Sequence, residues 1–216
     1  MLRALFSGFT PLWGIKKTPS GELAKVWQSG DVKVEGVEAT GIVLPQQYGL
    51  CTKLICDEIL AKQPHIVLMF GATQRNDPMR LERFAINVEK SVMGDNTKIP
   101  VKDRPIVQGG PAAYEPTIPV IELVDKLKGA GTDAKLSYHA GTHTCNSILY
   151  GVLHWLAQNP QPHLVATGFI HVSFPNDFGV IEDELWSTAT FSGIIQASVT
   201  LLEETAAWYR KTQGVK

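Results

Sequence analysis

The chain has 216 residues, of which 44% are hydrophobic and 19% charged, and its formal net charge is −1. These values suit a globular protein with a substantial core, and they exclude a strongly charged chain that would bind nucleic acid or a membrane surface through its charge. Three cysteines, an odd number, argue against a disulfide framework and for free thiols in a reducing compartment, so a cytoplasmic location is expected.

The first residues predict a β-strand rather than a targeting segment. Leu2 to Phe6 is a mostly apolar run, and Gly8 and Pro11 interrupt the sequence before it reaches the length of a signal peptide. No stretch reaches the roughly 18 apolar residues of a membrane-spanning helix. Further strands are predicted by alternating or continuous apolar runs that end in turn residues. They cover residues 31–44, 65–71, 84–89, 135–141 and 164–172.

Amphipathic helices are predicted between these strands. Apolar residues recur at helical spacing in residues 48–64, 118–131 and 193–209 and in the segment that follows Cys145. In the second of these helices, the expected buried stripe consists of Ile118, Ile121, Val124 and Leu127. Residues 11–22 and 93–116 are expected to be long functional loops. The alternation predicts one α/β domain over residues 1–216, a three-layer α/β/α sandwich with a mostly parallel twisted sheet.

Cys145 is the first candidate for chemistry, because it follows the turn Ala140-Gly141-Thr142 and opens a helical run. The unpaired N–H groups of a helix start stabilise a thiolate and so lower the pKa of a thiol placed there. The same groups could bind an oxyanion during acyl transfer. Cysteine is also among the most buried residue types, so its position alone leaves a packing role open.

His171 and Glu82 are possible partners of this thiol. His171 ends a predicted strand, and histidine is the usual base beside a cysteine nucleophile because its pKa lies near neutrality. Glu82, in the segment LERFAIN, could orient such an imidazole and stabilise its charged form. Each residue also has an ordinary interpretation, as a strand histidine bonded to backbone and as a solvated surface glutamate.

A metal site was considered at the same turn. His139, His143 and Cys145 form the pattern H-x3-H-x-C, which could in principle bind zinc. The spacing matches no strong zinc pattern, and side chains on a strand and a turn would point in different directions. We therefore expect no metal and no cofactor.

Five segments of the chain carry a family resemblance. In chain order they are SGFTPLWG, LERFAIN, DRPIVQGGPAAYEPTIP, AGTHTCNSILYGVLH and TGFIHV. Their content and their order along nearly the whole chain resemble the pyroglutamyl peptidase I (pyrrolidone-carboxylate peptidase) family of cysteine peptidases. The last two segments are the most specific, because each carries a chemically active residue at the matching place.

The resemblance implies a function and a mechanism. Glu82, Cys145 and His171 match the family's catalytic triad, and the activity implied is removal of an N-terminal pyroglutamate from a peptide. Cys145 would attack the carbonyl, His171 would take the thiol proton and return it to the leaving amine, and Glu82 would hold the imidazole. The family assembles as dimers or tetramers, so a homo-oligomer is also expected.

The resemblance also implies a small apolar slot for the lactam ring, which needs few polar contacts because pyroglutamate has no free amine. Phe9 and Leu12, in the first loop segment, match positions that flank the ring. Gly71 and Ala72, at the end of a predicted strand, match backbone positions that meet it.

Several residues depart from the family pattern. Leu12 and Trp13 stand where the family has phenylalanine and glycine, so the slot could differ in shape. Thr73 and Gln74 replace glycines and are less permissive of unusual backbone conformations. Val92 stands where the family usually has an arginine near the active site, whose loss could weaken charge stabilisation.

Two rival interpretations follow from these departures. The chain could be a cysteine hydrolase of the same fold that cleaves another small amide or lactam. It could also be a catalytically weak binding homologue that keeps the fold without turnover.

Overall fold

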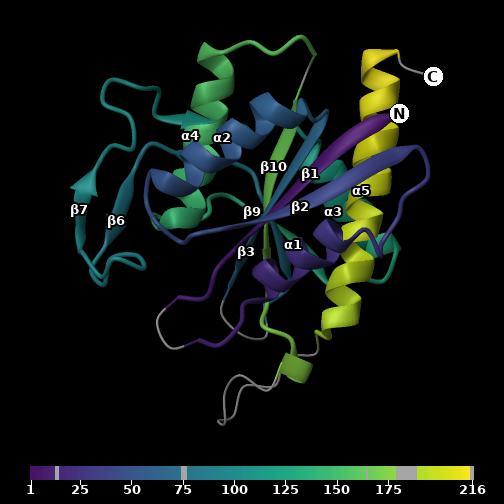
Figure 1. The fold of residues 1–216 in the computed structure, drawn as a ribbon, viewed down its shortest axis with the longest axis horizontal. Helices are drawn as coiled ribbons and strands as arrows, with labels where there is room; N and C mark the ends of the chain where they lie inside the picture. The colour runs from purple at the N-terminus through teal and green to yellow at the C-terminus, as the bar shows by residue number, and fades with distance from the viewer. Residues whose placement is uncertain (13–14, 74–76, 164, 179–188, 215–216) are drawn as a thin grey trace.

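Six strands form the central sheet of the computed structural model, which describes residues 1–12, 15–73, 77–163, 165–178 and 189–214. Their order is β2-β1-β3-β10-β4-β9, and they fan across the middle of the molecule (Figure 1). The strand bounds are β1 Leu2–Phe9, β2 Val37–Leu44, β3 Ile66–Ala72, β4 Met79–Glu82, β9 Ala134–Ser137 and β10 Ala166–Val172.

The sheet is parallel except at one pair. Only β4 and β10 run antiparallel, so the expectation of a mostly parallel sheet is confirmed. Because β1, β3 and β10 run in one direction, their carboxyl ends meet at one edge, toward the bottom of Figure 1. In that register His171 lies beside Gly71 and Val172 beside Ala72. The final residues of β3 and β10 therefore share the edge where ligands bind in open α/β sheets.

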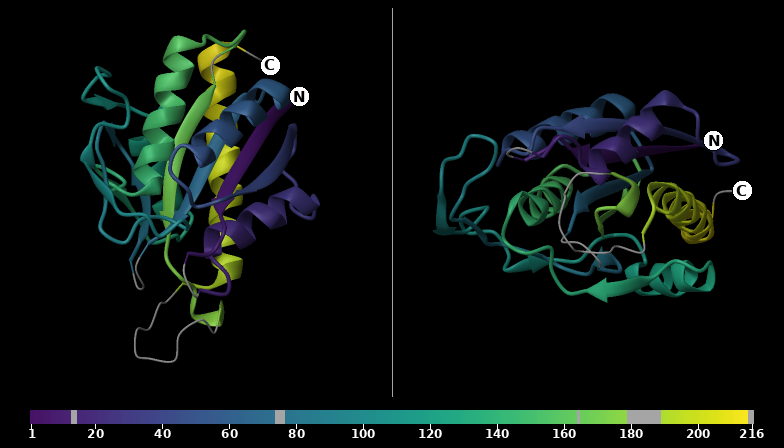
Figure 2. Two further views of the ribbon diagram at one scale, coloured as in Figure 1. Left: turned by 60° about the vertical axis from the view of Figure 1, so that its left-hand side comes forward. Right: turned by 90° about the horizontal axis from the view of Figure 1, so that it is seen from below.

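Helices cover both faces of the sheet. Their bounds are α1 Pro19–Ser29, α2 Leu50–Lys62, α3 Val120–Gly129, α4 Thr144–Gln158 and α5 Phe191–Gln213. Seen from below, α2 and α4 lie on one side of the sheet and α1, α3 and α5 on the other (Figure 2). This arrangement confirms the predicted three-layer α/β/α sandwich. Among the described residues, no helix has the length and apolar character needed to cross a bilayer.

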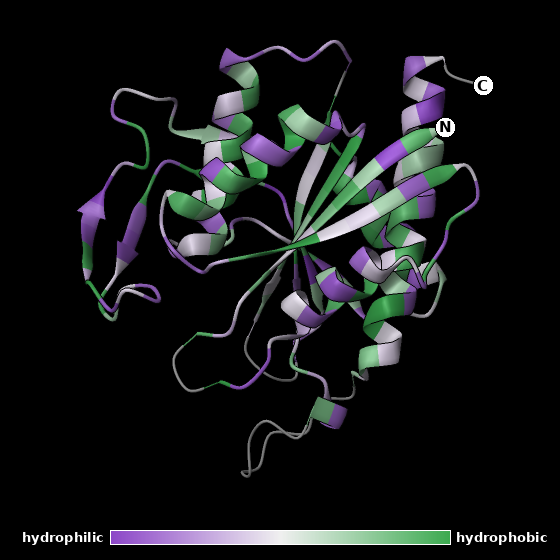
Figure 3. Ribbon diagram, viewed as in Figure 1, coloured by the Kyte–Doolittle hydropathy of each residue, from purple (hydrophilic) through white to green (hydrophobic). Residues whose placement is uncertain are grey.

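Each face of the sheet has its own apolar core, and green hydrophobic segments line the central strands in Figure 3. Strand β3 shows the reason, because its buried residues alternate between the two cores. Leu68 and Phe70 belong to the core under α1, α3 and α5, whereas Val67 and Met69 belong to the core under α2 and α4. A strand buried on both faces reads as a continuous apolar run, which is why this segment was predictable.

Two small sheets lie outside the central one. Strand β5 (Ala85–Ile86) pairs with β8 (Ala113–Tyr114), and β6 (Glu89–Ser91) pairs with β7 (Val101–Arg104) in the arm at the left of Figure 1. The predicted strand over 84–89 is therefore interrupted. The Val88 N–H bonds the Ile86 carbonyl at 2.8 Å and turns the chain between β5 and β6. The predicted loop 93–116 in fact contains two of these strands.

Three further expectations were wrong or incomplete. The predicted loop 11–22 overlaps α1, whose start is set by the Thr18 cap, where the side chain accepts from the Gly21 N–H at 3.2 Å. In α3, Ile121 is 51% exposed and Leu123 is buried in its place. Strand β4 was not predicted, because Met-Arg-Leu-Glu is short and half charged. A 3-10 turn, η1 (Asn176–Phe178), follows β10.

Candidate active site

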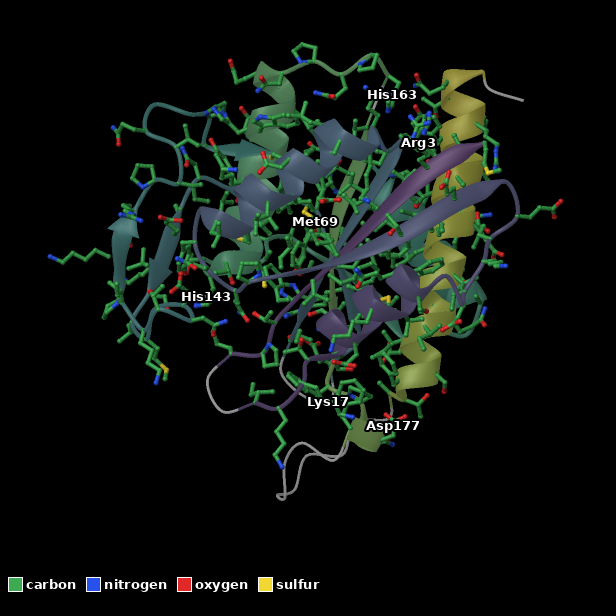
Figure 4. The ribbon with its side chains drawn as sticks, in the orientation of Figure 1. Arg3, Lys17, Met69, His143, His163 and Asp177 are labelled. Atoms are coloured by element: carbon green, nitrogen blue, oxygen red, sulfur yellow. The ribbon has the colours of Figure 1, made fainter. Side chains whose placement is uncertain are left out.

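Cys145 is the second residue of α4, as the sequence predicts, and the turn before it is tightly held. Gly141 has a φ of 80°, a conformation that glycine adopts without strain. The His143 ring bridges two elements, because Nε2 lies 2.9 Å from the Gly94 carbonyl and so carries the proton (Figure 4). The Ser147 N–H then closes the first helical turn on the His143 carbonyl at 3.0 Å.

Asn146 anchors this helix start, a role that the sequence analysis missed. The side chain is fully buried and bonds the backbone of the neighbouring β5 segment on both sides of its amide. Its Oδ1 accepts from the Ile86 N–H at 3.0 Å, and its Nδ2 donates to the Ile86 and Val88 carbonyls at 2.9 Å each. These bonds leave the adjacent Cys145 little freedom to move. The residue lies in the segment AGTHTCNSILYGVLH, but only the fold reveals its hydrogen-bond partners.

His171 and Glu82 form a buried pair. The imidazole Nδ1 lies 2.7 Å from Glu82 Oε1, and the two residues are 5% and 0% exposed. Since a carboxylate accepts, Nδ1 carries the hydrogen and Nε2 is left as the nitrogen that can take a proton. Glu82 is the last residue of β4, and His171 lies in β10, so the antiparallel pairing of these strands brings the two together.

Cys145 and His171 face the same side of the sheet and approach the same glycine. A Cβ on Gly71 would lie 3.0 Å from Cys145 Sγ and 2.8 Å from Phe169 Cζ. Gly71 is the register partner of His171, and the rings of Phe169 and His171 lie 5.0 Å apart between centroids. The sulfur, the imidazole and the carboxylate behind it therefore gather where β3, β10 and β4 meet the start of α4.

The electrostatics of Cys145 differ from the sequence expectation. Burial, with smaller contributions from Cys51 and Glu82, raises the pKa of its thiol to about 12. The backbone N–H of Cys145 and the Arg80 guanidinium act in the opposite direction but are weaker. The backbone contribution thus has the predicted direction, but burial outweighs it and the net shift of the thiol pKa is upward. Such a thiol needs an adjacent base at the moment of reaction.

Three of the four residues expected at the lactam lie at the carboxyl edge of the sheet. Phe9 is buried at the end of β1 in the same apolar core as Cys145, and Leu12 is half-buried. Gly71 and Ala72 end β3. Thus Phe9, Gly71 and Ala72 lie at the ends of neighbouring strands at the carboxyl edge.

The departures from the family pattern have different environments. Thr73 is buried just beyond β3, where its N–H bonds the Val172 carbonyl at 2.9 Å. Val92 is 81% exposed at the end of β6. Trp13 and Gln74 lie outside the described residues.

The two histidines of the H-x3-H-x-C pattern are held by backbone groups. His139 Nδ1 accepts from the Gly141 N–H at 3.1 Å, while His143 Nε2 is bonded to Gly94. Within the described part of the chain, no three His, Cys, Asp or Glu side chains gather as a metal site would need.

A separate cavity of about 270 Å³ lies on the other face of the sheet, between β4, β10 and the start of α5. Its walls include Met79, Val172 and Ile194. Neither Cys145 nor His171 lines it, so it is distinct from the site described above.

Comparisons with known proteins show which family and fold this chain resembles. The family model described as pyroglutamyl peptidase matches residues 2–202. Over 174 residues, the chain is 36% identical to a pyrrolidone-carboxylate peptidase of Yersinia pestis (strain Pestoides F), covering 81% of this chain and 79% of that protein. The pyrrolidone carboxyl peptidase from Thermococcus litoralis is 26% identical with a TM-score of 0.90, covering 98% and 96% of the two chains. A mutant pyrrolidone carboxyl peptidase from P. furiosus is also 26% identical, with a TM-score of 0.86 and 95% and 99% coverage.

Proposed function

The chain belongs to the pyroglutamyl peptidase family, and from that membership we propose that it removes the N-terminal pyroglutamyl residue of peptides by thiol catalysis. The family model spans most of the chain, and the relatives it resembles are named for this activity. The observation that carries the mechanism is the buried Glu82–His171 hydrogen bond, together with the packing of Cys145 Sγ against Gly71, the register partner of His171.

In the first step Cys145 is the nucleophile and His171 the base. Nε2 of His171 takes the thiol proton as Sγ bonds the carbonyl carbon that links pyroglutamate to the next residue. Glu82 accepts from Nδ1 at 2.7 Å and stabilises the imidazolium that forms. Burial raises the pKa of this thiol, so the proposed mechanism requires His171 as the base that takes its proton.

The remaining steps return the site to its starting state. The C–N bond breaks, the imidazolium gives its proton to the leaving amine, and a thioester joins pyroglutamate to Cys145. Water then attacks the thioester with His171 again as base, releasing pyroglutamate and the thiol. Backbone N–H groups in the first turn of α4 are placed to stabilise each oxyanion, since a helix start leaves them without intrahelical acceptors.

The lactam ring is recognised by an apolar slot in this proposal. Phe9 and Leu12 flank the ring, and the backbone of Gly71 and Ala72 meets its edge. A slot with few charges suits a substrate residue that carries no free amine. Cys145 Sγ packs against Gly71, so a ring seated at the end of β3 would present its carbonyl near the sulfur.

A panel of fluorogenic aminoacyl amides tests substrate and nucleophile together. The wild type is expected to cleave the pyroglutamyl amide and leave the others intact, and Cys145→Ala is expected to abolish turnover. Cys56→Ala is the matched control, because Cys56 is a buried thiol of the same core and is not among the groups that shift the pKa of Cys145. Cleavage of other amides but not the pyroglutamyl one would support the rival hydrolase. Absence of any turnover would support the binding homologue.

Two further readouts bear on the mechanism. The coupled Cys145–His171 pair predicts a bell-shaped pH dependence of kcat/KM, and a profile flat from about pH 5 to 9 would contradict it. Iodoacetamide should label Cys145 faster than Cys51 or Cys56, since the proposed mechanism gives Cys145 a base in His171.

The proposal extends to assembly and location. We expect a homo-oligomer, a dimer or tetramer, which sedimentation of the purified chain would test. A cytoplasmic location is supported by three free cysteines, since such thiols persist in reducing compartments. Cell fractionation would test the location.

A further inference from the structure

Arg80 links the buried carboxylate to the connection between β3 and β4. Its Nε lies 4.0 Å from Glu82 Oε1, and its Nη1 lies 3.3 Å from Asp77 Oδ2. Its Nη2 donates to Thr73 Oγ1, one residue beyond Ala72. The same guanidinium thus contacts the partner of His171 and the chain segment that follows the proposed lactam wall.

Unpaired polar atoms surround this contact. Within the described part of the chain, Arg80 Nε and Glu82 Oε2 are both buried without a hydrogen-bond partner. A buried donor or acceptor left unpaired is costly, and the cost is larger when the group is charged. The two unpaired atoms belong to side chains of opposite charge, two residues apart on β4, and Arg80 Nε lies 4.0 Å from the other carboxylate oxygen, Oε1. A direct hydrogen bond or a bridging water molecule can therefore satisfy both groups.

Because this inference rests on the proposed function, it concerns the same reaction: we propose that Arg80 is a positioning residue that holds the Glu82 carboxylate in place behind His171 and ties it to Thr73, next to the proposed lactam wall. Within the described part of the chain, the contacts of Arg80 are with Thr73, Asp77 and Glu82, and not with the Cys145 sulfur or the His171 imidazole. It acts through Glu82 and through the end of β3.

The charges around the pair make the role testable. Arg80 lies near Glu82 on its own strand and is the register partner of His171 on the neighbouring strand β10. Its charge also acts to lower the pKa of the Cys145 thiol on α4, against the larger effect of burial. Asp77 approaches the other side of the guanidinium and is itself bound by Lys135 of β9 at 2.5 Å. Burial acts to raise the pKa of Asp77, but Lys135 and Arg80 outweigh it, so the pKa is lowered and Asp77 stays a carboxylate.

Removing the Arg80 charge should shift the pH profile in the same direction whether the Cys145 thiol or the His171 imidazolium loses its proton first. A nearby positive charge eases the loss of a proton from both the thiol and the imidazolium. Removing that charge makes both losses harder. The acid and alkaline limbs of the kcat/KM profile should therefore move together to higher pH, each by about half a unit to one unit.

The experiment compares Arg80→Gln and Arg80→Lys with the wild type on a fluorogenic pyroglutamyl amide across pH. Arg3→Gln is the matched control, because it removes the same charge at the opposite end of the sheet, where Arg3 bonds the Gln63 carbonyl (Figure 4). Arg80→Gln should shift both limbs upward and lower kcat/KM at neutral pH by roughly tenfold or more. Arg80→Lys keeps the charge but lacks the planar fork, so its limbs should stay in place while kcat/KM falls.

The outcomes separate this inference from the proposed function. A wild type that does not cleave the pyroglutamyl amide overturns the proposed function. A wild type that cleaves it, with an Arg80→Gln profile whose limbs do not move or move no further than those of Arg3→Gln, overturns the role of Arg80. Thermal unfolding of each variant identifies loss of folding. Should Arg80→Gln fail to fold, Arg80→Lys decides, and a wild-type kcat/KM in that variant overturns the positioning role.

Discussion

Replacing Glu82 by glutamine removes one charge from the centre of the candidate site while preserving its shape. The carboxylate is fully buried, and Oε1 accepts from His171 Nδ1 at 2.7 Å. A glutamine oxygen can still accept from Nδ1, so the orientation of the imidazole should survive. What is lost is the negative charge that stabilises the imidazolium formed when Cys145 gives up its proton.

The size of the effect follows from the separation of the two groups. Unit charges 2.7 Å apart attract by about 6 kcal/mol at an effective dielectric constant of 20. The neutral amide retains part of this attraction through its dipole, and a hydrogen bond to a charged group is worth about 1.5–3 kcal/mol. A net loss of about 4 kcal/mol in the transition state corresponds to a fall in kcat/KM of roughly a thousandfold.

Stability should respond differently from activity. Glu82 Oε2 has no hydrogen-bond partner within the described part of the chain, so the buried charge is poorly compensated and its removal should cost little stability. Glu89→Gln is the matched control. Glu89 is also buried, but it lies 2.7 Å from Arg104 Nη2 and accepts from Ser147 Oγ at 3.0 Å. That variant should lose stability, by about 1–3 kcal/mol, while keeping its activity within about tenfold.

The assay is the pH-dependent kcat/KM for a pyroglutamyl amide together with urea-induced unfolding. We expect Glu82→Gln to be nearly inactive and about as stable as the wild type. A Glu82→Gln variant with kcat/KM within tenfold of wild type would refute the assignment of this carboxylate as the partner of a catalytic imidazole.

Three other perturbations have outcomes set by the structure. Gly71→Ala would place a Cβ 2.8 Å from Phe169 and 3.0 Å from Cys145 Sγ, so it should cost about 1–3 kcal/mol in unfolding and lower kcat/KM at least tenfold. Asn146→Ala leaves the Ile86 N–H and carbonyl without their side-chain partner, which should cost about 2–4 kcal/mol, and Asn146→Asp should cost more because it sets a carboxylate against two carbonyls. Burial, with His163, Arg3 and the chain amine, lowers the pKa of His65 from 6.5 to about 4. The unfolding free energy should therefore keep the full contribution of neutral His65 above pH 6.5. It should decline as the pH falls from 6.5 toward 4, because over that interval His65 is protonated in the unfolded chain but not in the folded chain.

Controls exist for each of these outcomes. Gly129→Ala meets open space at the end of α3 and should leave both stability and activity close to wild type. An Asn146→Asp variant as stable as Asn146→Ala would show that the two carbonyls do not face its side chain. For the pH effect, His65→Asn should flatten the decline of unfolding free energy between pH 6.5 and 4, and an unchanged slope would assign the decline to other groups.

Long apolar segments explain which elements were predictable. Strands β3 and β10 are buried on both faces, so each is a continuous apolar run that few other structures could accommodate. Strand β4 lacks that property, because Arg80 and Glu82 occupy one of its faces. These two charged side chains belong to the candidate site and not to an apolar core, so a prediction based on hydrophobic residues does not detect the strand.

The sequence by itself determined the α/β architecture, the family and the chain positions of Cys145, His171 and Glu82, because these depend on local runs and motifs. Tertiary structure alone decided how those positions act together. It placed Glu82 against the imidazole by pairing β4 antiparallel to β10, and it made burial outweigh the helix start at the thiol. It also brought Arg80 and Asn146 to the same region from segments whose local pattern carried no such signal. The physical reason is that hydrogen bonds and pKa values depend on distance and burial, which are properties of the folded chain.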